Sequence, residues 1–170
     1  MINDPYIDLA YKAVENWVKE KEKLTPPDRL PEDMLQNKKG VFVSIKKSGN
    51  LRGCMGTFEP TKEKIAEEII NNAISAGCRD PRFPPIEKEE LDELEISVDL
   101  LSSPQPCEKE DLDPGKYGII VKKGRRRGLL LPDLKEVNSS EEQLEIARRK
   151  AGLKDEKEEE LLRFEVERHK

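Results

Sequence analysis

The hexapeptide LRGCMG at residues 51–56 places a thiol and a guanidinium between glycines. Glycine adds no side chain, so Gly53 and Gly56 would let a ligand approach the sulfur of Cys54 closely. Arg52 precedes Cys54 by two residues, and on an extended strand two such side chains share one face. A nearby positive charge lowers a thiol pKa and favours the nucleophilic thiolate. The spacing therefore indicates a reactive cysteine. The alternative is a buried cysteine in a glycine-kinked strand, with Arg52 in a structural ion pair.

A second candidate segment is CRDPRFPP at residues 78–85, whose three prolines predict a rigid extended loop. The planar forks of Arg79 and Arg82 suit carboxylate or phosphate groups. Asp80 can orient an arginine or act as a base, although an aspartate before proline often hydrogen-bonds its own backbone. We expect Cys54 to act as nucleophile or proton donor in one pocket with these residues. Arg52, Gly53, Gly56, Arg79 and Arg82 would hold a small anionic substrate there.

A third feature is the basic run KKGRRR at residues 122–127, predicted to be the tip of a hairpin. Several cations around one turn can contact several phosphates, which suggests a non-catalytic nucleotide-binding or RNA-binding adaptor. The alternative is a solvated tip whose charges prevent edge-to-edge pairing of strands. The candidate nucleic-acid contacts are Lys122, Lys123, Arg125, Arg126 and Arg127.

Composition limits the other function classes. A net charge of -5 gives no global attraction to phosphate, so any anion site must be local. The three cysteines lack CxxC spacing and the one histidine is His169, so no zinc or iron–sulfur ligand set is recognisable. No GxGxxG, Walker or HExxH pattern occurs, and we expect no metal or cofactor. A secretory leader and a long apolar run are also missing, which indicates a cytoplasmic protein without a membrane role.

The first half of the chain predicts two helices and a strand pair. Asp4 and Pro5 are typical of a helix start, and apolar residues repeat on one face as far as residue 18. Residues 41–45 alternate as in a half-buried strand, and a turn at residues 48–50 leads into a strand ending near residue 58. A broad apolar stripe at residues 65–74 predicts a second helix, ended by Gly77.

The second half predicts mainly strands. A short helix around residues 87–91 precedes a strand at 94–100, and residues 102–116 read as a surface loop containing Cys107. Strands at 117–121 and 128–131 flank the basic turn. A capping box predicts a helix from Ser139 to about Ala151, ended by Gly152. The acidic run 155–160 reads as a solvated segment, and residues 162–166 as a closing strand. The order predicts an α+β fold, a mainly antiparallel sheet flanked by helices.

Five separated blocks resemble the AMMECR domain family: LRGCMGTFEP, CRDPRFPPIEKEELDELEISVDLLS, KYGIIVKKGRRRGLLLPDL, EEQLEIARRKAGL and RFEVERH. The resemblance covers nearly the whole chain, so residues 1–170 are expected to form a single AMMECR-like domain with a larger and a smaller subdomain. Met55 stands where the family often has isoleucine, a volume-conserving difference. The resemblance also implies a cleft near the glycine-flanked cysteine.

The resemblance is closest to stand-alone proteins of prokaryotic AmmeMemoRadiSam clusters, which implies a Memo-type protein and a radical-SAM protein as partners in a modification pathway. It implies no settled reaction, because a fold specifies activity poorly. Two kinds of function therefore stay open: a cysteine-dependent enzyme, and an adaptor or scaffold without chemistry. For the scaffold, Trp17 and Phe83 are candidate anchors, with core or loop packing as the alternative.

Overall fold

The computed structural model describes residues 3–154 and 159–170. Most of the acidic run predicted as a solvated segment lies outside these residues. The chain divides into two compact units: unit 1 is Met1–Leu101 with Glu167–Lys170, and unit 2 is Ser102–Val166. Each unit has its own sheet and helices, which agrees with the predicted α+β class.

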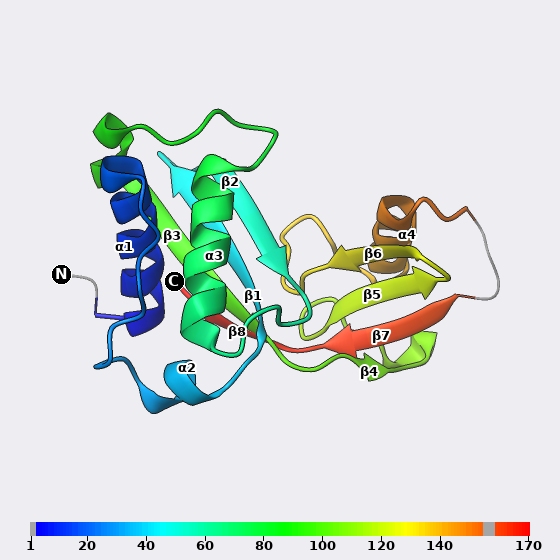
Figure 1. The fold of residues 1–170 in the computed structure, drawn as a ribbon. Helices are drawn as coiled ribbons and strands as arrows, with labels where there is room; N and C mark the ends of the chain where they lie inside the picture. The colour runs from blue at the N-terminus through cyan, green and yellow to red at the C-terminus, as the bar shows by residue number, and fades with distance from the viewer. Residues whose placement is uncertain (1–2, 155–158) are drawn as a thin grey trace. The chain divides into compact units, whose positions relative to one another are not determined.

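Unit 1 has a four-stranded sheet in the order β2-β1-β3-β8, covered on one face by two long helices (Figure 1). Strand β1 pairs antiparallel with both β2 and β3. The elements are α1 (Pro5–Glu20), α2 (Glu32–Gln36), β1 (Gly40–Lys47), β2 (Asn50–Thr57), α3 (Ile65–Cys78), the 3-10 helix η1 (Lys88–Glu93), β3 (Leu94–Leu101) and β8 (Val166–His169).

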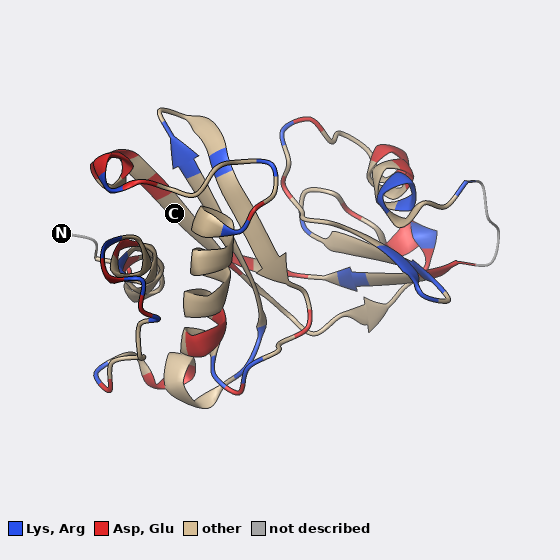
Figure 2. Ribbon diagram, turned by 45° about the horizontal axis from the view of Figure 1, so that its top comes forward, with Lys and Arg blue, Asp and Glu red and all other residues tan. Residues whose placement is uncertain are grey.

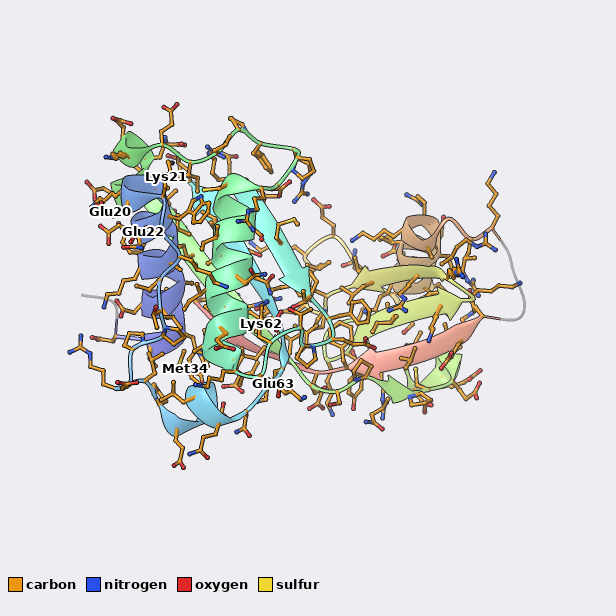
Figure 3. The ribbon with its side chains drawn as sticks, in the orientation of Figure 1. Glu20, Lys21, Glu22, Met34, Lys62 and Glu63 are labelled. Atoms are coloured by element: carbon orange, nitrogen blue, oxygen red, sulfur yellow. The ribbon has the colours of Figure 1, made fainter. Side chains whose placement is uncertain are left out.

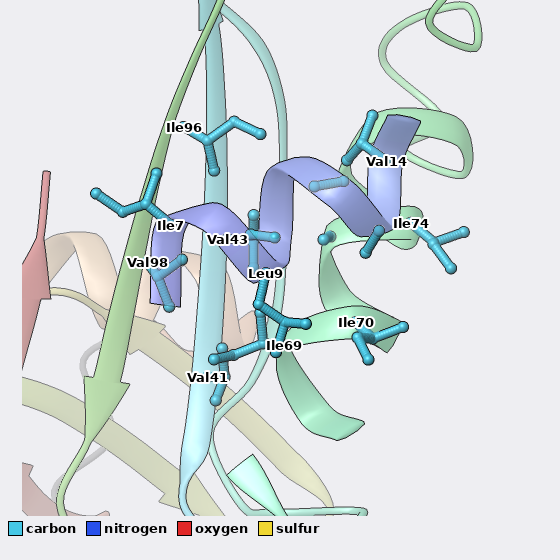
Figure 4. Packing of buried hydrophobic residues seen from close by; sticks show 14 of the residues in the cluster. Ile7, Leu9, Val14, Val41, Val43, Ile69, Ile70, Ile74, Ile96 and Val98 are labelled. Atoms are coloured by element: carbon cyan, nitrogen blue, oxygen red, sulfur yellow. The ribbon is translucent and has the colours of Figure 1, made fainter. Parts of the chain in front are cut away.

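Helix α1 begins as predicted, because Asp4 accepts hydrogen bonds from the backbone of Tyr6 and Ile7 at 2.9 and 3.3 Å. Its apolar face packs with α3 onto β1 and β3, and Figure 4 shows side chains from all four elements meeting. Alternate residues of β1 point into this core: Val41, Val43 and Ile45 are fully buried. The residues between them therefore point to the opposite side, which we call the far face of the sheet.

Helix α3 runs one residue past its predicted end. Gly77 lies inside the helix, and a Cβ atom there would lie 3.2 Å from the Ile86 side chain. This glycine therefore serves close packing, and Cys78 is the last helical residue. The short helix α2 was not predicted. Its Met34 is fully buried. Figure 3 labels this residue on the short helix.

The turn between β1 and β2 consists of Ser48 and Gly49, whose φ angles of 51° and 77° are both positive. Such a two-residue turn matches the twist of a hairpin. The pairing has one irregularity: Ile45 faces Gly53 but Lys46 faces Leu51, so Arg52 is the extra residue of a β-bulge. The hairpin was predicted, but the bulge was not.

Unit 2 has a second four-stranded antiparallel sheet, in the order β4-β7-β5-β6, with α4 on one face. The predicted loop 102–116 contains the short strand β4 and the 3-10 helix η2. The elements are β4 (Gln105–Pro106), η2 (Lys109–Asp111), β5 (Gly118–Lys123), β6 (Arg126–Leu130), α4 (Ser140–Ala151) and β7 (Glu160–Phe164).

Helix α4 has the predicted ends. Ser139 Oγ accepts from the backbone of Glu142 at 3.1 Å, and Gly152 ends the helix with a φ of 70°. The predicted closing strand is two strands, because β7 pairs with β4 and β5 in unit 2 whereas β8 joins the sheet of unit 1. The chain changes sheets at Glu165, which alternation along the sequence does not reveal.

Segments distant in sequence are held together at two places. Ser102 donates its backbone N–H to Glu165 O at 2.9 Å, and Glu165 donates back to Ser102 Oγ at 2.8 Å. In unit 1, Asp4 Oδ2 lies 2.7 Å from His169 Nδ1, and the His169 ring stacks on Tyr6 with centroids 4.1 Å apart. The start of α1 is therefore attached to the end of β8.

Candidate functional site

Cys54 lies on the far face of the unit 1 sheet, in the middle of β2. Its neighbour Gly53 points the other way, since a Cβ atom there would lie 2.0 Å from the carbonyl oxygen of Ala76 in α3. Cys54 pairs across the strands with Ser44, and its Sγ is 3.3 Å from Ser44 Oγ. Ser97 of β3 faces Ser44 from the other side. A row of small polar side chains therefore crosses three strands at the half-buried thiol.

Asp80 fixes the backbone of Cys54. Its carboxylate is nearly completely buried and accepts from Cys54 N at 3.0 Å and from Arg82 N at 3.1 Å. The guanidinium of Arg82 binds the same carboxylate through Nε at 3.0 Å and Nη2 at 2.7 Å. These hydrogen bonds, led by those from Arg82, hold the pKa of Asp80 far below its ordinary range. A carboxylate held this firmly suits an orienting role better than that of a base.

Arg82 completes this clamp at the edge of the sheet, because β2 is the outermost strand. Its Nη2 also donates to the carbonyl of Cys54 at 3.3 Å, so both backbone polar groups of Cys54 are held by one Asp–Arg pair. Among the described residues, Nη1 of Arg82 has no hydrogen-bond partner, and the side chain is 56% exposed. Arg82 therefore has a donor left for an anion.

Arg52 was predicted to share a strand face with Cys54, but its guanidinium binds other groups in the structure. Its Nε and Nη2 form a two-point ion pair with Glu90, at 2.9 Å each, while Nη1 donates to Pro84 O at 2.8 Å. The hydrogen bonds from Arg52 lower the pKa of Glu90 to about 2. Because its side chain is only 13% exposed, Arg52 fastens the proline-rich loop and leaves little surface for a substrate.

The remaining predicted site residues lie as follows. The guanidinium of Arg79 stacks over the Trp17 ring of α1 at 5.2 Å, away from the Asp80 clamp. The space beside Gly56 is filled by the Phe42 ring, which would lie 2.3 Å from an added Cβ atom. The structure thus brings Cys54, Asp80 and Arg82 together. Arg52 lies beside Glu90, Arg79 beside Trp17, and each glycine accommodates a neighbour inside unit 1.

Sequence reasoning missed Ser44, Glu90 and a buried polar group around Glu68. Ser44 could have been found from the strand register, because it lies between two core positions and opposite Cys54. Glu68 is fully buried in α3 and accepts from Thr57 and Thr61 hydroxyls at 2.7 and 2.8 Å. The sequence indicates Glu68 as unusual, because it is an acidic residue within the apolar stripe of a predicted helix. Glu90 has no local signal, since its partner is distant in sequence.

The other cysteines differ from Cys54 in their surroundings. Cys54, Cys78 and Cys107 are all free and half-buried. Burial raises the thiol pKa of both Cys78 and Cys107. Within residues 3–154 and 159–170, no cluster of histidine, cysteine or acidic side chains is arranged to hold a metal ion. In the same ranges, no helix has the length and apolar character needed to span a membrane.

The predicted basic residues lie at the end of the β5–β6 hairpin. The turn is narrower than expected: β5 runs to Lys123 and β6 starts at Arg126, so only Gly124 and Arg125 connect them. Figure 2 shows Lys and Arg gathered at this turn. Their outward position is compatible with both the adaptor and the solvated-tip interpretations.

Comparison with known proteins covers almost the whole chain. A family model described as AMMECR1 matches residues 7–169, across both units. A protein of Thermotoga maritima is 47% identical over 169 residues, covering 98% of this chain and 97% of its own. A protein of Clostridium acetobutylicum is 49% identical over 168 residues, which make up only 36% of that longer protein.

The solved structures agree with the sequence comparison. The crystal structure of PH0010 from Pyrococcus horikoshii matches with a TM-score of 0.87 and 32% sequence identity, covering 96% of this chain and 88% of that one. Agreement in sequence and in fold along nearly the full length leads to one conclusion: the chain belongs to the AMMECR1 family.

Proposed function

We propose that this AMMECR1-family protein is an enzyme whose chemistry is centred on Cys54, acting as nucleophile or proton donor towards a small anionic substrate. The observation that carries the proposal is the clamp on Cys54. A buried Asp80 and its partner Arg82 fix the backbone N–H and C=O of this one residue. The hydrogen-bond partner of the thiol among the described residues is the Ser44 hydroxyl. Holding a reactive group by surrounding hydrogen bonds is what precise chemistry requires.

The roles divide among the nearby residues. Ser44 is the proton partner of the thiol, since either atom of the pair can donate across 3.3 Å. Arg82 contacts the anionic group of the substrate through its unused Nη1, while its other nitrogens stay on Asp80. Arg52 is a positioning residue that holds the proline-rich loop through Pro84. The substrate is therefore one that carries a carboxylate or phosphate near an electrophilic or proton-accepting centre.

The test is alkylation of the native protein with iodoacetamide across a pH series, resolved by mass spectrometry after digestion. Cys78 and Cys107 are internal controls, because they are comparably exposed and burial raises the pKa of each thiol. We expect Cys54 to be alkylated faster than both at each pH. The variant Ser44→Ala should change the alkylation rate of Cys54 alone. A Cys54 that reacts only after unfolding would overturn the proposal and favour an architectural cysteine.

The proposal extends to partners. On the basis of the family resemblance, we propose that this protein acts together with a Memo-type protein and a radical-SAM protein in one modification pathway. Co-purification of the three proteins, followed by the same alkylation assay, provides the test. Protection of Cys54 by either partner is expected, whereas unchanged alkylation and separate elution would count against the partnership.

A further inference from the structure

The β5–β6 hairpin contains an arrangement that costs stability. Lys122 lies directly opposite Arg127, and Lys123 directly opposite Arg126, with Arg125 in the turn between the strands. Like charges facing each other across an antiparallel pair destabilise it. Two such pairs in succession break a rule that hairpins normally follow, and such breaks tend to mark functional positions.

The fold adds further cations to the same place. Arg126 Nη1 donates to Gly152 O at 3.1 Å, and Lys150 Nζ donates to Leu129 O at 3.2 Å. The end of α4, which carries Arg148, Arg149 and Lys150, is therefore attached to β6. Strand β6 packs closely on α4, because a Cβ atom at Gly128 would lie 1.9 Å from the carbonyl oxygen of Ala147. We call the hairpin cations and the last turn of α4 the basic ribbon surface (Figure 2).

Acidic residues offset part of this charge. Glu160 faces Lys122 across β5 and β7, Glu159 binds Arg148, and Glu145 lies 3.2 Å from Arg149. Lys123, Arg126 and Arg127 also have contacts within the chain. A ligand must therefore compete with these carboxylates, which a polyanion does by offering many phosphates at once.

We propose that the basic ribbon surface binds the phosphate backbone of duplex DNA. A two-stranded ribbon fits the major groove of B-form DNA, whereas the major groove of an RNA duplex is too narrow for it. Residues 118–130 contain no aromatic side chain on which unpaired bases could stack, which disfavours single strands. We expect the lysine and arginine side chains to contact phosphates at the groove edges, so that binding is independent of base sequence. This surface lies in unit 2 and does not depend on the chemistry of Cys54.

The test uses the full chain and a fluorescent 20-base-pair DNA duplex of mixed sequence, with affinity measured between 50 and 300 mM salt. Each phosphate contact contributes about 0.9 to the slope of log affinity against log salt. The double variant Arg125→Gln/Arg127→Gln should therefore reduce the slope by about 2. The control Lys38→Gln/Lys88→Gln removes the same charge from exposed positions of unit 1 and should leave the slope unchanged.

Several results would overturn the proposal. They are the absence of DNA binding at 50 mM salt, an unchanged slope in the double variant, or tighter binding of an RNA duplex or a single strand of equal length. Because β6 is an edge strand, the like charges could instead serve to block edge pairing. In that case the double variant would self-associate on a sizing column while DNA binding stayed as in the unaltered chain. Thermal unfolding of both variants recognises a folding defect: the double variant should be at least as stable as the unaltered chain, because Arg127→Gln removes one of the facing like charges.

Discussion

Asp80 shows how much of the candidate site depends on single side chains. One carboxylate with almost no exposed surface holds the backbone of a strand, the backbone of a loop and an arginine. Hydrogen bonds to a charged group contribute about 1.5–3 kcal/mol each when they are buried. Such a residue affects stability and chemistry together, and the two effects have to be measured separately.

Replacing Asp80 with asparagine should lower the free energy of unfolding by about 1–3 kcal/mol. The amide keeps the size of the carboxylate but loses the charge that binds Arg82, and Arg82 is half exposed, which screens part of the loss. Urea unfolding measures the change, with Asp8→Asn as the control for an exposed ion pair. A change no larger than that of the control would mean that the clamp stabilises the folded state no more than an exposed ion pair does.

The Arg52–Glu90 pair predicts acid sensitivity with a definite sign. The pKa of Glu90 falls from its ordinary 4.5 to about 2, so the folded state binds its proton less readily than the unfolded state. The stabilisation is complete above about pH 5 and is lost as the pH falls towards 2. Urea unfolding at several pH values should show a flatter decline for Glu90→Gln than for the unaltered chain. Parallel declines would contradict the ion pair.

At the scale of elements, the contact of β2 with α3 explains why a glycine precedes the cysteine. No side chain fits at Gly53, because the carbonyl of Ala76 occupies its space. The strand therefore lies directly on the helix, and this closeness sets the depth at which Cys54 sits. The glycines beside Cys54 suggested room for a ligand, but the space beside Gly53 is taken up by the packing of β2 on α3.

Gly53→Ala should accordingly destabilise unit 1 by about 3 kcal/mol, since backbone and not a flexible side chain must move. Gly115→Ala is the matched control, because an added Cβ atom there meets only Asp113 Oδ1 at 3.4 Å. Thermal unfolding of both variants gives the comparison. Equal melting temperatures would show that α3 can shift away freely.

Local patterns predicted those elements whose ends are defined by their own residues. Helices α1 and α4 began at the predicted caps, Asp4 and Ser139, because a capping side chain acts within a few residues. The bulge at Arg52, its pairing with Glu90 and the split of the last strand depend on partners far along the chain. Of the candidate site, the sequence thus indicated Cys54 and the Asp80 loop, but not which arginine would stay available.

At the scale of the whole molecule, unit 2 is inserted between two strands of unit 1. The chain leaves unit 1 after Leu101 and returns at Glu167, and the hydrogen bonds between Ser102 and Glu165 hold the two crossings together. Unit 2 has a core of its own between α4 and its sheet, formed by Leu112, Ile119, Val121, Leu130, Leu144, Ala147, Ala151 and Leu153.

Residues 102–166 expressed alone should therefore fold, although with a lower melting temperature than the full chain, because about 65 residues bury a small core. Circular dichroism on heating is the measurement, and a cooperative transition is expected. The variant Gly128→Val serves as an unfolded reference, because its side chain would collide with α4. If the isolated segment behaves like that reference, unit 2 depends on unit 1 for its structure.

The contact between Asp4 and His169 has a consequence for circular permutation, in which the elements follow one another along the chain in a different order. Because the Asp4 carboxylate and the His169 ring are 2.7 Å apart, a short linker can join the segment that precedes Asp4 to the segment that follows His169. New ends can then be opened at the exposed turn of Ser48 and Gly49. Such a circular permutant keeps every strand neighbour while β2 becomes the first element synthesised and β1 the last. Unit 1 would then have to close its sheet across the newly made chain ends, so the permutant separates the architecture of the sheet from the order of its synthesis.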